Sequence, residues 1–283
     1  MTRALVLVTA LALPLSGRAD RGLRFDPTDA SHALVIDLEI ELPVVFASAT
    51  ILVTSQVLVD PHGPKRCGWC DTRSSLNGFD SLGMDALDGA NRRSAGLGSD
   101  LLGYAGMPVV TLGLGLLASL DATRGMPGTY RARRYGIDVL LVTEAAVDTL
   151  AVMQVVKLAS KRRRPSAIDE PVDGTRAVDR NLSFFSGHTA LAFSLATSAG
   201  VLATLRHERL APLVWVVGYV AATATGISRM AADKHFASDV IVGSVVGAGV
   251  GALIPVLHRT RVPVHLGGSA SSTSAMFSLS GLL

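Results

Sequence analysis

Long apolar segments follow one another at short spacing along this chain. Beyond the first twenty residues there are six of them, and the last contains 18 residues without a charge. They cover residues 33–59, 99–120, 134–162, 186–205, 210–227 and 240–257. Hydrophobic residues make up 49% of the sequence and charged residues only 17%, a balance typical of multi-span membrane proteins. We therefore expect an all-α, membrane-embedded bundle of about six helices, forming one domain.

The charge balance restricts the partners. The formal net charge is +3, and the basic residues lie in the loops between the apolar segments. This modest excess suits anionic lipid head groups or phosphates, and membrane lipids are expected neighbours. It is not the dense basic stripe of a nucleic-acid binder, so no nucleic-acid partner is expected.

The two ends of the chain differ from the middle. Residues 1–19 combine Arg3, a short apolar run and small residues at cleavage positions, which is typical of a secretory signal peptide. An uncut N-terminal anchor is the alternative. Residues 32–258 are expected to form the helical domain, although alternation in 35–42 is also compatible with a strand. The tail, 259–283, alternates weakly and is expected to form a small hairpin or to be flexible.

Two further features bear on packing and redox state. Gly243, Gly247 and Gly251 recur every four residues, a spacing that allows a second helix to approach closely, or that marks a merely glycine-rich helix. Cys67 and Cys70 form a CxxC pair without the other ligands of a zinc site or the context of a redox dithiol. A local disulfide in an exported loop is the favoured interpretation.

The first of three polar clusters ends the segment 134–162. Lys157 and Arg164 are seven residues apart, almost two helical turns, and Pro165 places Arg164 at or just beyond the helix end. An ammonium and a guanidinium that converge at a helix end suit a phosphate. A basic cluster next to the membrane is the alternative, and Lys161, Arg162 and Arg163 are assigned to it.

The second cluster, Ser186-Gly187-His188, begins an apolar segment. One interpretation is an ordinary helix N-cap with Ser186 as the capping residue. The other is a phosphate site, because the N–H groups at a helix N-terminus attract anions.

The third cluster begins with Ser228-Arg229 and continues to His235 and Asp239. If this stretch is helical, His235 and Asp239 share a face, and the carboxylate leaves one imidazole nitrogen available as a nucleophile. A structural hydrogen bond is the alternative for the pair alone.

The three clusters lie in the loops between the third and fourth and between the fifth and sixth segments. In a six-helix array these loops share one membrane face, so two histidines, one aspartate and three cations would meet there. This combination implies phosphoryl transfer through a phospho-histidine, with no metal cofactor expected. Glu144 and Asp148, four residues apart within a helix, are expected to make buried contacts between helices, with a substrate-side role as the alternative.

The ordered set, Lys-x6-Arg-Pro, Ser-Gly-His and Ser-Arg-x5-His-x3-Asp, resembles the signature of the type 2 phosphatidic acid phosphatase superfamily over 157–239. That superfamily also contains bacterial acid phosphatases and vanadium haloperoxidases. The usual proline before Ser-Gly-His is Phe185 here, which puts the exact loop geometry in question.

The resemblance implies a role for each site residue. His235 would be the nucleophile and Asp239 its orienting carboxylate, while His188 would be the general acid that protonates the leaving alcohol. The phosphate oxygens would be bound by Lys157, Arg164, Ser186, Gly187 and Arg229.

The resulting expectation is a metal-independent phosphatase acting on a phosphorylated lipid, such as phosphatidate, a prenyl pyrophosphate or a lipid A-type phosphate. A soluble exported acid phosphatase, a vanadium haloperoxidase and a non-catalytic membrane scaffold are the alternatives. The expected location is a bacterial inner membrane with the site facing the periplasm. A cleaved leader followed by six spans would instead turn the site to the cytoplasm, so either the leader stays or one segment, the first, does not span.

Overall fold

The computed structural model describes residues 23–24, 34–36, 38–62, 67–168, 180–259, 265–270 and 275–280. The expected leader, 1–19, lies outside these residues. The helices are α1 (Leu38–His62), α2 (Gly78–Asp85), α3 (Arg92–Leu101), the π-helical η1 (Leu102–Gly106), α4 (Met107–Ala122), α5 (Gly128–Ser160), the 3-10 helix η2 (Pro165–Ala167), α7 (Gly187–Leu205), α8 (Ala211–Ala231) and α9 (Ala237–Leu257).

Four short strands accompany the helices and form two antiparallel pairs. Strand β1 (Leu23–Arg24) pairs with β2 (Val35–Ile36), and β3 (His265–Ala270) pairs with β4 (Ala275–Ser280). The alternating stretch at 35–42 is therefore divided, because β2 ends at Ile36 and helix α1 begins at Leu38.

Five helical stretches are long and apolar enough to cross a membrane. They are Arg92–Ala122, Gly128–Ser160, Gly187–Leu205, Ala211–Ala231 and Ala237–Leu257. Helix α1 adds a shorter apolar stretch, Glu41–Ser55. Large apolar side chains point away from the bundle, and Val109, Val220 and Val245 are 72%, 66% and 67% exposed. Such a surface suits lipid rather than water, which confirms the expected all-α, membrane-embedded bundle.

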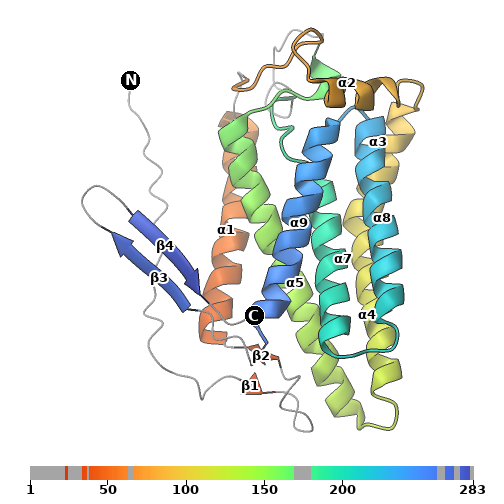
Figure 1. Cartoon of the computed structure of the whole chain (residues 1–283), viewed down its shortest axis with the longest axis vertical. Coiled ribbons are helices and arrows are strands. Elements are labelled where there is room, and N and C mark those ends of the chain that lie inside the picture. The colour runs from red at the N-terminus through yellow and green to blue at the C-terminus, as the bar shows by residue number, and fades with distance from the viewer. Residues whose placement is uncertain are drawn as a thin grey trace.

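Helix α7 is the centre of the bundle (Figure 1). In its most apolar 18-residue stretch, 78% is buried, whereas in the corresponding stretches of the other four long helical segments 22% to 44% is buried. It packs against α4, α5, α8 and α9. Because α7 begins with Ser186-Gly187-His188, the most enclosed helix of the fold carries the second polar cluster at its first turn.

The glycine stripe of α9 makes the closest of these contacts. A Cβ atom added at Gly243 would lie 2.7 Å from the backbone oxygen of Ser186, and one added at Gly251 would lie 2.5 Å from that of Ser194. Gly247 faces the backbone of Ala190 in the same way. The four-residue spacing thus serves close helix packing, and it holds α9 directly against the first turns of α7.

The second apolar segment begins earlier than the sequence indicated. The segment was expected to begin at residue 99, but the helix starts at Arg92, and the side chain of Asn91 accepts a hydrogen bond from the Ser94 N–H. From Arg92 onward, α3, η1 and α4 follow one another without a break. The consequence is that Ser99 and Asp100 lie within the helix and face neighbouring elements instead of its terminus.

One end of the bundle gathers the polar loops. Helix α2, the end of α5 and the beginning of α9 lie together there, whereas β1 and β2 lie at the opposite end (Figure 1). Helix α1 runs from the strand end toward this polar end. The three polar clusters of the sequence therefore share one end of the molecule.

Candidate active site

Backbone hydrogen bonds join the three polar clusters to one another. Arg164 N–H donates to the carbonyl of Arg180 at 2.8 Å, which links the first cluster to the segment before α7. Ser186 N–H donates to the carbonyl of Asp239 at 3.0 Å and links the second cluster to the third. Ser166 N–H donates to the carbonyl of Asp233 at 3.0 Å and links the segment of the first cluster to that of the third. The expected convergence of these segments is therefore present in the fold.

His235 lies in the loop between α8 and α9, one residue before Phe236, the N-cap of α9. The sequence interpretation depended on a helix from His235 to Asp239, and that helix is not formed, because α9 begins only at Ala237. Asp239 is the third residue of α9, and its Oδ2 accepts from the Phe236 N–H at 3.0 Å as part of a helix cap. The pair is nevertheless adjacent, because the cap folds the loop back over the first turn.

The contact between the two side chains is loose. His235 Nδ1 lies 3.7 Å from Asp239 Oδ2, beyond hydrogen-bond distance, and finds no hydrogen-bond partner within the described part of the chain. Catalytic hydrogen bonds are often long before substrate binds. The ring is only 2% exposed, and its orientation comes from packing in the loop.

The electrostatic surroundings favour the neutral form of this ring. Burial lowers the pKa of His235 well below its usual range. The positive charges of Arg164, Lys157 and Arg229 lower it further, which also shows that these three cations act on the same point. At neutral pH the imidazole therefore keeps a lone pair, as a nucleophile requires.

His188 lies in the first turn of α7 and is covered by η1, which belongs to the second apolar segment. Its ring packs against Tyr104, with centroids 4.2 Å apart and the planes tilted by 54°, and a Cβ atom at Gly103 would come within 3.0 Å of it. Its Nε2 lies 3.0 Å from Asp100 Oδ1, although out of line for a hydrogen bond. Asp100 also binds Arg229 Nη1 at 2.7 Å, so this carboxylate bridges two site residues.

The side chain at the start of α7, beside His188, does not cap the helix. Ser186 occupies the N-cap position, but its side chain makes no capping bond to the helix. Its hydroxyl instead shares a 2.8 Å hydrogen bond with the hydroxyl of Thr189. The simple capping interpretation is therefore wrong for the side chain, and N–H groups at a helix N-terminus of this kind attract anions.

The cations of the site are buried. Lys157, Arg164 and Arg229 are 9%, 7% and 5% exposed. Arg164 lies four residues beyond the end of α5 in extended backbone, so the shared helix face that was predicted for it and Lys157 does not exist. The chain instead turns at Lys161, which has a left-handed backbone conformation, and continues as extended backbone at Arg164 before Pro165 begins η2.

Comparison with known proteins agrees with this geometry. Residues 138–263 match the family model of the PAP2 superfamily, and this stretch contains all three clusters. The stretch 138–263 is therefore similar to the PAP2 superfamily.

Two relatives show how far the similarity extends. A lipid A 1-phosphatase of Porphyromonas gingivalis is 37% identical over 140 residues, 48% of this chain and 28% of that protein. The chain thus spans only about a quarter of that relative's length. The crystal structure of a transmembrane PAP2 type phosphatidylglycerolphosphate phosphatase from Bacillus subtilis has a TM-score of 0.47 at 17% identity, covering 74% of this chain and 94% of its own.

Arg162, within the stretch that matches the PAP2 model, differs most from its sequence-based interpretation. It was assigned to a solvated basic cluster, yet it is fully buried. Its guanidinium binds Asp71 at 2.9 Å, Asp80 at 2.7 Å and Asp239 at 2.6 Å. The rings of Trp69 and Phe236 lie 4.0 Å and 4.2 Å from it. Arg162 therefore fixes the carboxylate that lies beside His235.

Each group in this cluster stabilises the charge of the others. Burial alone would lower the pKa of Arg162, but attraction to Asp239 and hydrogen bonds to Asp80 and Asp71 raise it. Burial alone would raise the pKa of Asp80, but hydrogen bonds from Ser238 and Arg162 lower it. Arg162 and Asp80 thus favour their charged forms. No motif spacing could reveal this cluster because its members come from four separate segments.

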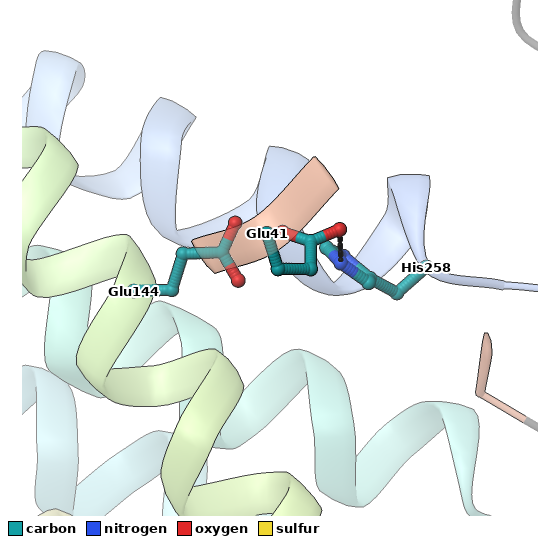
Figure 2. A group of neighbouring side chains, drawn as sticks. All are labelled: Glu41, Glu144 and His258. Atoms are coloured by element: carbon teal, nitrogen blue, oxygen red, sulfur yellow. Dashed lines mark hydrogen bonds and ion pairs between the residues drawn. The ribbon is translucent and has the colours of Figure 1, made fainter. Parts of the chain in front are cut away.

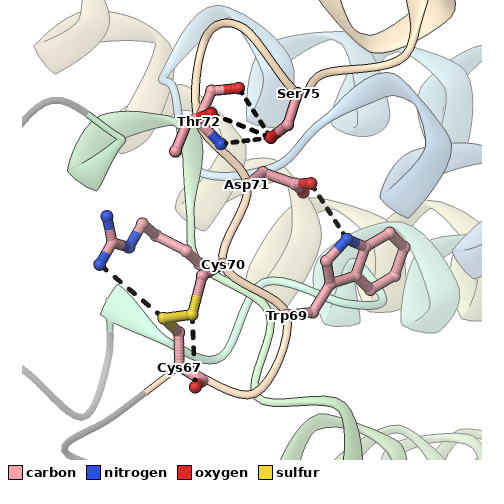
Figure 3. The surroundings of a disulfide bond; sticks show 7 residues. Cys67, Trp69, Cys70, Asp71, Thr72 and Ser75 are labelled. Atoms are coloured by element: carbon pink, nitrogen blue, oxygen red, sulfur yellow. Dashed lines mark hydrogen bonds between the residues drawn. A yellow bond between two sulfur atoms is a disulfide. The ribbon is translucent and has the colours of Figure 1, made fainter.

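The loop that supplies Asp71 lies outside the matched stretch 138–263 and contains the cysteine pair. Cys67 and Cys70 are joined by a disulfide, and Trp69 Nε1 donates to Asp71 (Figure 3). Gly68 N–H donates to the carbonyl of Lys161, and Arg163 N–H donates to that of Trp69. The disulfide loop is therefore attached to the same strand-like segment that carries Arg162 and Arg164.

A polar cavity of about 270 Å³ opens next to the clusters. Pro165 and Asp233, which border it, are the immediate neighbours of the phosphate-site segments. The remaining lining residues are Arg73, Met84, Asp85, Asp88, Arg92 and Ser166. Five of these six residues precede the stretch 138–263 that matches the PAP2 model. The cavity is therefore formed largely by a part of the chain that the family model does not cover.

Proposed function

We propose that this protein is a phosphoric monoester hydrolase that removes a phosphate group from a lipid through a phospho-histidine intermediate. The observation that carries the proposal is the convergence of three buried cations on two histidines, at one end of a bundle of membrane-length helices. Such a site can bind a phosphate at the membrane surface while the lipid chains stay in the bilayer.

The proposed reaction has two steps. The free nitrogen of His235 attacks phosphorus, the ester P–O bond breaks, and the leaving oxygen takes a proton from His188. His188 then removes a proton from water, which attacks the phospho-histidine and releases inorganic phosphate and His235. Lys157, Arg164 and Arg229, with the N–H groups at the start of α7, would stabilise the charge on the transferring phosphoryl group.

The substrate class we favour is a lipid whose phosphate is attached to a polar, hydroxylated head group. The similarity to a lipid A 1-phosphatase supports a lipid A-type phosphate, and the polar cavity beside the clusters offers space for the rest of a head group. Phosphatidate and prenyl pyrophosphates need no such cavity and are the substrates to compare.

The direct test is phosphate release by the purified protein from a panel of these three lipid phosphates in detergent. We expect release from at least one of them and the highest kcat/KM on the lipid A-type substrate. A His235→Ala protein serves as the control. Lipid binding without release by either protein would instead favour a scaffold.

We expect hydrolysis to persist in excess EDTA and to be inhibited by vanadate. Three cations face the phosphate site and would repel a divalent ion, and its carboxylates, Asp100 and Asp239, are paired with Arg229 and Arg162, whereas two-metal hydrolases offer free carboxylates. Vanadate, an analogue of phosphate, should bind the same cations. The measurement is the initial rate at increasing EDTA or vanadate, well below the unfolding temperature. Loss of turnover on chelation and its recovery with magnesium or zinc would contradict the mechanism.

We also propose that the site faces an oxidising compartment, which in a Gram-negative bacterium is the periplasm. The disulfide loop and the phosphate site lie at the same end of the bundle, so both must be on one side of the membrane. Disulfides persist in exported loops and are reduced in the cytosol.

Thiol labelling in intact cells tests this sidedness. We expect a membrane-impermeant maleimide to label Cys67 and Cys70 only after treatment with an impermeant reductant. A Cys67→Ser/Cys70→Ser protein gives the background signal. Free thiols that become reachable only after cell lysis would place the site on the cytoplasmic side.

A further inference from the structure

A second polar cluster lies far from the phosphate site. Glu41 of α1, Glu144 of α5 and His258, which follows α9, converge between the three helices (Figure 2). Their potential ligand atoms all lie within 4.8 Å of one another. Asp239 and His258 mark opposite ends of α9, about 28 Å apart at 1.5 Å per residue, so this cluster takes no part in the proposed hydrolysis.

Glu144 is the residue that this environment leaves unexplained. It is 3% exposed, and its Oε2 finds no hydrogen-bond partner among the residues that the structure describes. Its carboxyl group points toward Glu41 (Figure 2). Buried carboxylate oxygens are normally hydrogen-bonded or bound to a cation, because an unpaired one is costly. Two neighbouring carboxylates increase that cost.

His258 is oriented as a ligand of a cation. Its Nδ1 lies 2.7 Å from the carbonyl oxygen of Ile254, to which it donates when the ring is neutral. Its Nε2 then points into the cluster, 2.7 Å from Glu41 Oε1. Metal-binding imidazoles are commonly held in this way, with the other nitrogen bonded to a backbone carbonyl that fixes the tautomer.

We propose that Glu41, Glu144 and His258 bind one divalent transition-metal ion, such as zinc, that joins α1, α5 and α9. The two carboxylates would balance the charge of the ion, which leaves a neutral site between membrane-length helices. An imidazole with two carboxylates suits zinc and its neighbours better than magnesium or calcium, which prefer oxygen ligands alone. To admit the ion, His258 Nε2 and Glu41 Oε1 must separate to about 3.3 Å, the spacing of tetrahedral zinc ligands.

The nearby carboxylate of Asp148 is not part of the proposed ligand set. Its Oδ1 accepts a 2.6 Å hydrogen bond from the hydroxyl of Ser48, which joins α5 to α1 by a separate contact. The metal would therefore add a second connection between α1 and α5 and would also join them to α9. It would lie toward the end of the bundle away from the disulfide loop.

Zinc binding to the full-length protein tests the proposal. The protein is purified in detergent without a histidine tag, dialysed against buffered free zinc, and its metal content is measured. We expect wild type to bind zinc, and Glu144→Gln and His258→Gln to bind it at least about tenfold more weakly, the smaller effect expected even for an outer-shell partner. Glu208→Gln is the matched control, because Glu208 is a buried glutamate paired with Arg134. It should bind zinc like wild type.

A second measurement separates binding at this cluster from binding elsewhere. Zinc should raise the thermal unfolding temperature of wild type and of Glu208→Gln, but not that of Glu144→Gln, since a ligand of the folded state stabilises it. Magnesium at the same concentration should have no such effect. Equal zinc affinity in wild type and Glu144→Gln, or equal stabilisation by zinc of both, would overturn the proposal.

Discussion

Replacing His235 by alanine should reduce the turnover of a lipid phosphate by several orders of magnitude while the bundle stays folded. The side chain lies in a loop, is 2% exposed, and is one of the two imidazoles on which Arg164, Lys157 and Arg229 act together. Loss of a nucleophile cannot be compensated by phosphate binding alone, and it typically costs far more than a hundredfold in kcat. The measurement is kcat for wild type and His235→Ala on the same lipid.

His207→Asn is the matched control for that experiment. His207 follows α7 at the end away from the phosphate site and has a positive φ of 52°, a conformation that asparagine tolerates. It should keep a wild-type rate. Residual activity of His235→Ala within about tenfold of wild type would contradict the assignment of the nucleophile.

Replacing Arg162 by alanine should lower the free energy of unfolding by about 3–5 kcal/mol, the cost of removing one partner from a buried ion pair. The change would leave Asp71, Asp80 and Asp239 close together without their common cation. Arg162→Lys keeps the charge but cannot reach all three carboxylates with one ammonium. We expect Arg162→Lys to fold and to have a lower kcat, because Asp239 loses its fixed position.

Thermal or denaturant unfolding in detergent, combined with kcat, measures both effects. Arg163→Ala is the control, since the adjacent guanidinium donates to Cys67 Sγ at 3.8 Å and, among the described residues, forms no ion pair with Asp71, Asp80 or Asp239. An unfolding free energy for Arg162→Ala within about 1 kcal/mol of the control would show that the cluster is not what holds this end of the protein together.

The sequence predicted the helices well because their pattern is long and strongly apolar. It also predicted the convergence of His188, Arg229 and His235, since short loops between successive helices must return to the same end. The helix assumed between His235 and Asp239 was wrong because a capping turn, which periodicity does not reveal, brings the two together. The start at Arg92 was missed for the same reason, as Asn91 provides the cap.

Arg162 and its partners could not be predicted from the sequence. A buried arginine and a solvated one look identical in a basic run, and only the tertiary fold brings Asp71 and Asp80 to it. Asp100 was missed similarly, because it lies at the front edge of an apolar segment and only the fold brings it to His188 and Arg229. For both, the information lies in contacts between distant segments, and the roles assigned to the site residues stay predictions until the variants are measured.

The Arg162 cluster has a consequence for biosynthesis. Its carboxylate partners lie 91 and 82 residues before Arg162 and 77 residues after it. When Asp71 and Asp80 have been synthesised, Arg162 has not, and Asp239 is added only with the last long helix. The nascent chain thus contains the three cations proposed to bind phosphate before it can assemble the cluster. We expect such a chain to remain inactive until membrane insertion is nearly complete, so that its hydrolytic activity begins only after the final helix is in place.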